Sequence, residues 1–334
     1  MLRTTNRALI VGLGSIGRRH LINLRALVPS ADITLLRRPT SRPDGCQTLA
    51  NRVVYTIDHA LRFSPQFAIL SNPAPKHISV GMSLAKNGVH LCIEKPLSHS
   101  LDGVDDLITT CQKLNLTLVV AYHLRFCRSL RAVVAAVREG RIGRPMGLRA
   151  EVGQYLPEWR ENVDYRNAVS ARRELGGGVL LELSHELDYA NWIIGAPVSV
   201  TAHIGRLSNL DVDVEDYAEI NLRFANGAIG NIHLDMVQRP STRSCKVYGT
   251  DGTIVWNGLV QRADYFNVEN GEWSELCSPD ETSGRQAYIT MLEHFLACVR
   301  GEAAPLIDGL QGKQALEVAL AARRAAEEKR EVKV

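Results

Sequence analysis

A glycine-rich connection near the N-terminus constrains the fold of this chain more than any other feature. The apolar run 8–11 leads directly into three glycines spaced as GxGxxG, at Gly12, Gly14 and Gly17. A stretch with helical periodicity opens at Ser15. Strand, glycine turn and helix in this order predict the first crossover unit of a parallel sheet, whose helix amides bind a dinucleotide diphosphate. Because glycines are common, the alternative is a glycine-rich turn of an unrelated α/β protein.

The alternation of short apolar runs with longer amphipathic stretches continues to Val120 and predicts parallel strands joined by helices. The predicted strands are 8–11, 33–36, 67–70, 90–93 and 117–120. The predicted helices begin at Ser15, run over 75–87, and run from Ser98 or Ser100 through Leu114. This series indicates a doubly wound sheet.

The pattern changes beyond Arg125. After a helical stretch to about Arg138, alternating apolar and polar residues predict strands at 146–152, 198–203, 218–224, 228–234 and 244–248. Helices are predicted over 184–194, 286–299 and 309–328. The predicted fold class is therefore α/β, with an N-terminal Rossmann dinucleotide-binding domain over residues 1–123. A C-terminal α/β domain with an open, mostly antiparallel sheet follows over residues 124–334, and its uncovered face requires a ligand or a second subunit.

Composition excludes several other classes of protein. The 39 Lys and Arg residues nearly balance the 36 Asp and Glu residues and form no basic stripe, so nucleic acid is not an expected partner. Without a CxxC pair, the cysteines indicate small apolar fillers in a reducing compartment rather than zinc ligands. We expect a soluble, cytoplasmic protein, because no apolar stretch is long enough for a membrane span. The acidic run 211–216 resembles a metal site, but we expect a solvated charge run and no metal.

Arginines follow the second predicted strand, where an acid would select the adenosine ribose of NAD. Asp32 opens that strand and so falls at the wrong end of the sheet. Arg37 and Arg38, followed by Ser41 and Arg42, can instead hold a 2′-phosphate through charge-assisted hydrogen bonds. This favours NADP over NAD, the alternative being that the arginines are solvated or stack on adenine.

Polar residues also follow the third and fourth apolar strands. Ser71, Asn72 and Pro73 come after the first of these, and Glu94, Lys95 and Pro96 after the second. An open α/β sheet binds its ligands at this edge. The Lys95 amine can hydrogen-bond a substrate hydroxyl and stabilise a developing alkoxide, although a lysine at a strand end is more often a solvated charge.

Four segments, VGLGSIGRRH, ILSNPAPKHISVGMSLAKNGVHLCIEKPLS, YHLRF and GGGVLLELSHELDYANWIIG, resemble the Gfo/Idh/MocA oxidoreductase family in order and spacing. The resemblance implies a Rossmann domain, a C-terminal domain with an open sheet, and a homodimer or homotetramer formed through that sheet. It also implies that Lys95 is catalytic. The implied cofactor-binding residues are Gly12, Gly14, Ser15, Ile16, Gly17, Ser71, Asn72, Pro73, His77, Glu94 and Lys95.

The second catalytic segment departs from the family pattern of three glycines followed by Asp and then His. Glu182 stands where Asp is expected, and His185 falls one residue before the strict His position, which Glu186 occupies. The resemblance favours His185 as the acid/base, with Asp188 orienting it or binding substrate. The alternatives are Glu186 in that role and a histidine that merely caps a helix start.

Aromatic and arginine side chains precede the triple glycine and indicate a substrate lid suited to a sugar with hydroxyls and a carboxylate or phosphate. A plain surface loop is the alternative. The candidate substrate residues are Tyr122, Arg125, Tyr155, Trp159, Arg160, Tyr165, Arg166, His185 and Asp188.

The sequence therefore predicts an NAD(P)-dependent oxidoreductase that moves a hydride between a nicotinamide and a secondary alcohol of a sugar, polyol or sugar derivative. The LSHELDY variant resembles relatives associated with surface-sugar biosynthesis and favours a modified or acidic sugar. Two alternatives remain open: a glycoside hydrolase that uses transient oxidation by bound NAD, and a dinucleotide sensor without catalysis.

Overall fold

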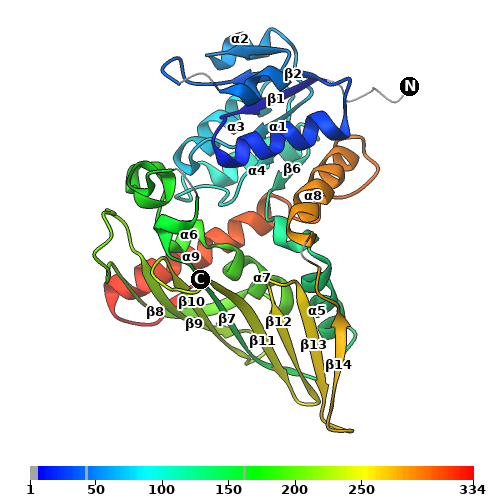
Figure 1. Ribbon diagram of the computed structural model, residues 1–334, viewed down its shortest axis with the longest axis vertical. Coiled ribbons are helices and arrows are strands. Elements are labelled where there is room, and N and C mark those ends of the chain that lie inside the picture. The colour runs from blue at the N-terminus through cyan, green and yellow to red at the C-terminus, as the bar shows by residue number, and fades with distance from the viewer. Residues whose placement is uncertain (1–6, 42–43, 161–162, 281) are drawn as a thin grey trace. The chain divides into compact units, whose positions relative to one another are not determined.

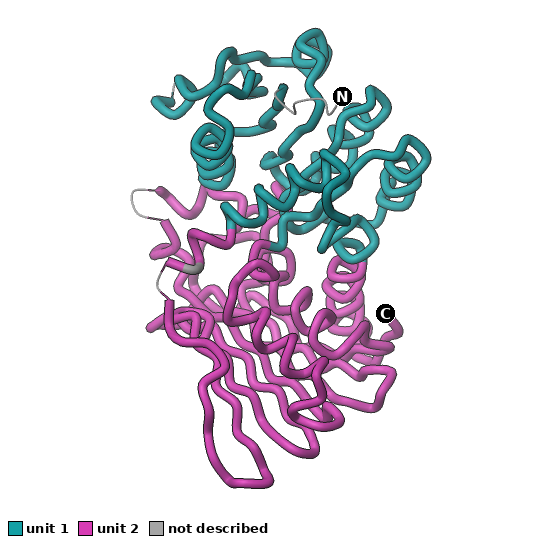
Figure 2. Tube along the Cα trace, turned by 90° about the vertical axis from the view of Figure 1, so that its right-hand side faces the viewer, with its two compact units in different colours: residues 1–122, 288–313 teal, residues 123–287, 314–334 magenta. Residues whose placement is uncertain are grey.

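The computed structural model describes residues 7–41, 44–160, 163–280 and 282–334, which form two compact units. The first unit comprises the described residues of Met1–Tyr122 together with Tyr288–Lys313, and the second comprises those of His123–Ala287 together with Gln314–Val334 (Figure 2). Within the described ranges, no helix combines the length and apolar character needed to cross a membrane.

A six-stranded parallel sheet forms the centre of the first unit (Figure 1). Its strands are β1 (Arg7–Val11), β2 (Asp32–Leu36), β3 (Arg52–Val54), β4 (Phe67–Leu70), β5 (His90–Ile93) and β6 (Leu118–Val120). Their spatial order is β3-β2-β1-β4-β5-β6. This is the doubly wound order, which reverses between β1 and β4, so ligands are expected outside the carboxyl ends of these strands.

Helices connect these strands and cover the sheet. They are α1 (Ser15–Leu27), α2 (Ile57–Leu61), α3 (His77–Ala85) and α4 (Val104–Lys113). The predicted strands are confirmed to within one residue, although β3 was not predicted. The helix predicted from Ser98 or Ser100 begins later, at Val104, because Gly103 precedes it with a left-handed φ of +71°.

The chain returns to the first unit near its C-terminus, through parts of α8 (Ser283–Val299) and α9 (Gly309–Glu328). The ring of Phe295 packs edge-on against that of Phe67, with 5.7 Å between centroids. The Val120 amide donates to the carbonyl oxygen of Ile307 at 3.1 Å, beyond the β6 edge. The predicted C-terminal domain, 124–334, includes residues 288–313, which here lie in the first unit.

A nine-stranded sheet forms the second unit, in the order β14-β13-β12-β11-β7-β10-β9-β8-β15. Every neighbouring pair is antiparallel except β7 and β10, which confirms the mostly antiparallel prediction. The strands are β7 (Pro145–Gly153), β8 (Pro197–Gly205), β9 (Tyr217–Phe224), β10 (Ile229–Asp235), β11 (Thr242–Gly249), β12 (Gly252–Asn257), β13 (Arg262–Asn267), β14 (Glu272–Cys277) and β15 (Val332–Lys333). Strands β12 to β15 were not predicted from the sequence.

Helices α5 (Arg128–Arg138), α6 (Val179–Glu182) and α7 (His185–Ile194) pack against this sheet. The largest fully buried side chain, Trp256, donates through Nε1 to Ser129 Oγ at 2.8 Å, which ties β12 to α5. Ser129 in turn donates to Gln261 Oε1 at 2.8 Å. An indole N–H and a hydroxyl are thereby satisfied inside the apolar layer, as buried polar groups require.

All seven cysteines are free thiols, and all except Cys46 are buried. Burial raises the pKa of the Cys111 thiol to about 11. The Cys111 thiol is therefore protonated near neutral pH and acts as a small apolar side chain.

A polar cluster lies on strands β9 and β10 of the second unit. His233 lies within hydrogen-bonding distance of Glu219 Oε1 (2.7 Å) and Asp235 Oδ2 (2.9 Å). The ring of Tyr217 contacts that of His233 edge-on. The hydrogen bond to Asp235, and then that to Glu219, raises the pKa of His233 against the opposing effect of burial.

A raised pKa means that the folded chain binds this proton more tightly than the unfolded chain. The resulting stabilisation is complete below the unfolded pKa of about 6.5 and is lost as pH rises through the folded pKa. We therefore expect His233→Gln to lower the urea unfolding midpoint most below about pH 6 and progressively less above neutrality. The measurement is urea unfolding of the wild type and variant across this pH range.

Asn231→Ala provides the matched control, because Asn231 also lies on β10 and donates through Nδ2 to Asn221 Oδ1 of β9 at 3.1 Å. Neither amide is ionisable, so its effect should not vary with pH. An equal loss from His233→Gln at every pH would contradict the proposed ionic contribution.

Candidate active site

The glycine loop holds the end of β1 against the end of β4. Gly12 has a φ of +92°, and a Cβ there would lie 3.0 Å from the Ser71 carbonyl oxygen. At Gly17 a Cβ would lie only 2.3 Å from the Gly12 carbonyl oxygen, so α1 packs directly on the loop. A Cβ on Gly14 would meet nothing within 4 Å. The loop is thus tightly packed on one side and open at Gly14, the arrangement that lets a diphosphate approach the backbone.

The first turn of α1 fits an anionic group. Gly14 caps the helix without a side-chain hydrogen bond, and the first turn contains no acidic residue. Ser15 is exposed and Ile16 is partly exposed, so the amides of this turn are not covered by a capping side chain. A helix start of this kind attracts a diphosphate through its amides and its dipole.

The residues after β2 are more heavily paired than the sequence suggested. Arg37 donates through Nη1 to Gln47 Oε1 at 2.5 Å, whereas Arg38 is exposed. Asp44, which the sequence analysis did not consider, lies 2.5 Å from Arg18 Nη2 and accepts from the Cys46 amide. An acid is therefore present beyond β2, but an arginine engages it.

Two further residues named after β2 behave differently. Asp32 pairs with Arg52 Nη1 at 2.7 Å from the first residue of β2, which agrees with its reading as a strand-entry residue. Arg42 lies outside the described residues.

The end of β4 presents an amide that has no partner. Ser71 Oγ donates to the carbonyl oxygen of Val11 at 2.9 Å and so joins β4 to β1. The next residue, Asn72, has a buried side-chain oxygen and nitrogen, neither of which is hydrogen-bonded within the described chain. Pro73 then begins the short turn that leads into α3. Because a buried, unsatisfied amide costs about 1–3 kcal/mol, Asn72 fits a ligand that both donates and accepts there.

His77 braces the backbone rather than projecting toward a ligand. The side chain is buried, and its Nδ1 and Nε2 lie 3.0 Å and 2.7 Å from the carbonyl oxygens of Pro96 and Asn72. Burial lowers the pKa of His77, opposed by these two carbonyls. A neutral imidazole donates to one carbonyl at a time, and both carbonyls flank the strand-end segments. The cofactor contact that the family resemblance implies for His77 stays a prediction.

The end of β5 carries the lysine. Glu94 is buried, and its Oε1 lies 2.6 Å from Nε2 of the fully buried His20 on α1. Its Oε2 accepts from the backbone amide of Lys95 at 3.2 Å, and Lys95 itself is partly exposed. Sequence reasoning missed His20, although its position one turn after Gly17, on the same helix face as Leu24, was a usable signal.

The triple glycine of the second unit lies against two other segments. A Cβ on Gly177 would lie 2.3 Å from the Val169 carbonyl oxygen, and one on Gly178 would lie 2.4 Å from the Glu215 carboxylate. Helix α6 begins directly after, and its last residue, Glu182, accepts a hydrogen bond from Ser170 Oγ at 2.5 Å. Glu182 thus fixes the preceding segment rather than standing alone.

The first turn of α7 contains the predicted acid/base. His185 is the first residue of the helix and is buried, and the ring of His123 contacts it edge-on with 4.5 Å between centroids. Glu186 is fully buried and accepts from Arg243 Nε at 3.0 Å. Glu186, the alternative acid/base candidate, therefore forms an ion pair with Arg243.

Asp188 is paired with another predicted substrate residue. Arg125 donates to both of its carboxylate oxygens, at 3.0 Å and 2.7 Å, and both side chains are buried. Burial raises the pKa of Asp188, and Arg125 opposes that shift. These two residues hold the start of α7 against the 123–126 turn, and their contact with a substrate stays a prediction.

The remaining candidate substrate residues differ in burial and in their contacts. Tyr122 is fully buried at the end of the first unit. In the second unit, the Tyr155 ring lies under the Arg239 guanidinium, and Trp159 donates to the Gln154 carbonyl at 2.8 Å. Arg160 is partly exposed.

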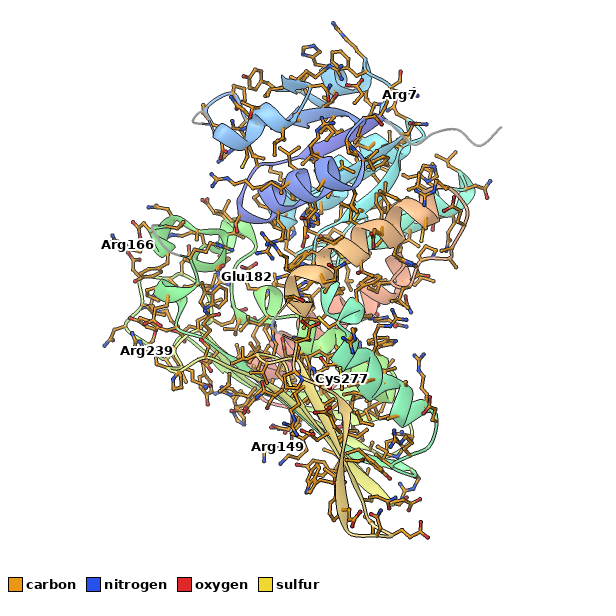
Figure 3. The ribbon with its side chains drawn as sticks, turned by 45° about the vertical axis from the view of Figure 1, so that its right-hand side comes forward. Arg7, Arg149, Arg166, Glu182, Arg239 and Cys277 are labelled. Carbon is orange, nitrogen blue, oxygen red and sulfur yellow. The ribbon has the colours of Figure 1, made fainter. Side chains whose placement is uncertain are left out.

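Tyr165 and Arg166 come later in the same segment. Tyr165 accepts from the Asp211 amide, and Arg166 pairs with Asp164 at 2.8 Å. Figure 3 shows Arg166 and Arg239 at the outer edge of this unit, whereas Glu182 lies nearer its interior.

The acidic run 211–216 is only partly solvated. Asp216 is fully buried and accepts from the backbone amides of Leu207 and Ser208, so the prediction of a solvated run is wrong at this residue. Glu215 pairs with Arg323 at 3.1 Å. Among the residues that the structure describes, no group of three or more His, Cys, Asp or Glu side chains is arranged to hold a metal ion.

Comparison with known proteins finds one family over both parts of the chain. Residues 6–122 match the NAD-binding Rossmann fold of the Gfo/Idh/MocA oxidoreductase family, and residues 134–334 match its C-terminal alpha/beta domain. The chain is 27% identical to myo-inositol 2-dehydrogenase of Thermotoga maritima, with 97% of each chain covered. It is 25% identical to UDP-N-acetylglucosamine 3-dehydrogenase of Acidithiobacillus ferrooxidans, with 95% of this chain and 96% of that one covered.

A solved structure shares the fold. The WlbA dehydrogenase from Bordetella pertussis, in complex with NADH and UDP-GlcNAcA, superposes with a TM-score of 0.87 at 21% identity, covering 100% of this chain and 99% of that one. The matches to both domains, in the same order and over nearly the whole length, show that the chain belongs to the Gfo/Idh/MocA family of oxidoreductases.

Proposed function

We propose that this oxidoreductase is an NAD(P)-dependent dehydrogenase for a secondary alcohol of a sugar, polyol or sugar derivative. The observation that carries the proposal is the convergence of three strand ends in the first unit. The open glycine loop follows β1, the unpartnered Asn72 amide follows β4, and Lys95 follows β5, and these strands are neighbours in the sheet. The names of the relatives, an inositol dehydrogenase and a nucleotide-sugar dehydrogenase, support the substrate class.

Each residue has a separate task in this proposal. When bound, the nicotinamide supplies the hydride acceptor or donor. The amides at the start of α1 hold the diphosphate, and the Asn72 amide binds the nicotinamide end. Lys95 donates a hydrogen bond to the substrate oxygen and stabilises negative charge on it as the carbon–hydrogen bond breaks.

We assign the exchange of the hydroxyl proton to His185. An imidazole gains and loses a proton near neutral pH, which suits a group that must do both in a reversible reaction. Glu186 and Asp188 lie in the same helix turn as His185, and each is paired with an arginine from another segment. These pairs position the start of α7. Glu182, through Ser170, positions the segment that precedes it.

The oligomer and the compartment belong to the same proposal. We assign subunit contact, in a homodimer or homotetramer, to the face of the second sheet that carries the exposed side chains of Arg149 and Glu151, because buried residues alternate with them along β7. We assign the cytoplasm as the compartment, where free thiols remain reduced.

The first prediction concerns turnover and Lys95. With inositols, sugars, uronates and nucleotide sugars as a panel, we expect net formation of NADH or NADPH in step with loss of one substrate. Lys95→Met should lower kcat by roughly 10²–10³-fold, because one donor to the developing oxyanion is lost. Binding of NADH or NADPH, measured by thermal shift, should be largely retained.

Lys86→Met is the matched control, because Lys86 is an exposed lysine just beyond α3. Its kcat should equal that of the wild type. Cleavage of a glycoside without net change in NAD(P)H would replace the dehydrogenase by the hydrolase alternative. Tight dinucleotide binding with no turnover across the panel would favour the sensor.

The second prediction separates His185 from Glu186. His185→Asn should lower kcat by roughly 10²–10⁴-fold, the usual contribution of a positioned acid/base, with little change in melting temperature. Glu186→Gln should lower the melting temperature, because it weakens a buried ion pair, and should leave most of kcat. The reverse pattern, with Glu186→Gln inactive and His185→Asn active, would transfer the acid/base role to Glu186.

The third prediction concerns the choice of dinucleotide. We propose that NADP is favoured and that the exposed Arg38 holds its 2′-phosphate, because Arg37 and Arg18 already have partners. Loss of a hydrogen bond to a charged group costs about 1.5–3 kcal/mol, so Arg38→Ala should raise the Kd of NADPH by roughly 10-fold to 100-fold. The Kd of NADH should stay unchanged. A wild type that binds NADH more tightly than NADPH would overturn the preference.

A further inference from the structure

His20 occupies a position on α1 that apolar side chains normally fill. Its side chain is fully buried, on the helix face that also contains Gly17, Leu21 and Leu24. Burying an imidazole costs free energy unless its polar atoms are used. One ring nitrogen, Nε2, lies 2.6 Å from Glu94 Oε1, and the other, Nδ1, has no partner within the described chain. The hydrogen bond to Glu94 is thus the one that the structure gives this imidazole within the described residues.

The partner of His20 is attached to the backbone of Lys95. The Glu94 amide still donates to the Leu70 carbonyl at 2.9 Å, as the continuation of the β4–β5 ladder. The Lys95 amide donates instead to Glu94 Oε2 at 3.2 Å, so a side chain takes over where the sheet ends. With Glu94 Oε1 as the acceptor, His20 donates from Nε2. Two hydrogen bonds therefore connect α1 to the backbone of Lys95.

A second buried histidine anchors the other side of the lysine. His77 Nδ1 lies 3.0 Å from the Pro96 carbonyl oxygen, and Pro96 has no amide of its own to contribute. The backbone on each side of Lys95 therefore lies against a side chain from a helix. Glu94 with His20 of α1 is on one side, and His77 of α3, whose neutral imidazole donates either to Pro96 or to Asn72, is on the other. Side-chain contacts thus take over from the sheet hydrogen bonds where β5 ends.

We propose that His20 is a positioning residue for Lys95. It holds the Glu94 carboxylate, which holds the Lys95 amide, and it does so from the helix whose first turn fits the dinucleotide diphosphate. Diphosphate binding at the start of α1 and the placement of the lysine are thereby coupled through one side chain. This inference rests on the proposed function of Lys95.

The test compares three variants by two measurements. His20→Met fills the same space without a donor, His20→Gln restores an N–H toward Glu94, and His90→Gln alters a histidine at the opposite end of the same strand. His90 accepts from the Thr117 amide at 2.9 Å and is remote from Glu94 along β5, so it serves as the matched control. The first measurement is the rate at which acetic anhydride modifies the Lys95 amine, followed by mass spectrometry with and without NADH and referenced to Lys86. The second is the pair kcat and KM for the substrate found in the panel.

In His20→Met, we expect faster modification of Lys95 and weaker protection by NADH, because the segment is no longer held. We also expect kcat to fall by about 10–100-fold with little change in KM, the size of effect seen when a supporting hydrogen bond is removed from a catalytic group. His20→Gln should return both measurements toward the wild type. His90→Gln should leave both unchanged, whatever its effect on melting temperature.

A His20→Met variant that melts earlier but keeps the wild-type modification rate and kcat would show that His20 only fills space. If His20→Met does not fold, His20→Asn takes its place, since its amide is too short to reach Glu94. The modification rate needs no substrate, so it tests the His20 link even if no turnover is found. Retention of turnover by Lys95→Met would remove the proposed role of Lys95 and would leave the modification rates of the His20 variants as an independent readout.

Discussion

The structure depends on the direct contact between the first turn of α1 and the loop that follows β1. Only a residue without a side chain allows this contact, because a Cβ on Gly17 would lie 2.3 Å from the Gly12 carbonyl oxygen. The contact fixes the direction of the amides at the start of α1. It also fixes the height of His20 above the sheet, and so the point where this helix meets Glu94. One backbone approach therefore sets both the anion-binding end of the helix and the environment of the lysine.

In the second unit, buried ion pairs play the equivalent part around α7. Arg125 pairs with Asp188 and Arg243 pairs with Glu186, and both carboxylates lie within three residues after His185 in the first helical turn. A buried ion pair contributes little net stability but is costly to break, so such pairs enforce one arrangement of the helix start. The position of His185 is therefore determined by its charged neighbours rather than by apolar packing alone.

The fold was largely predictable from the sequence, because fully buried strands are read directly from apolar runs. Strand β4, for example, has the predicted bounds 67–70. The three-residue β3 was too short to give such a pattern, and Ser98 and Ser100 imitated helix caps although the chain turns again before Gly103.

The location of Asn72 and Lys95 just after β4 and β5 was also predicted from the sequence, since it follows from where these strands end. The ion pairs around α7 could not be predicted from the sequence. Arg125 meets Asp188 across 63 residues and Arg243 meets Glu186 across 57, and no local pattern encodes which distant charges will meet.

The return of residues 288–313 to the first unit affects how this molecule can be divided. The first unit is built from two stretches of chain, so a fragment that ends at Tyr122 would leave the edge of β6 uncovered and Phe67 without Phe295. A chimaera with a relative would have to exchange residues 1–122 and 288–313 together. A single crossover would pack one protein's sheet against the other protein's C-terminal helices.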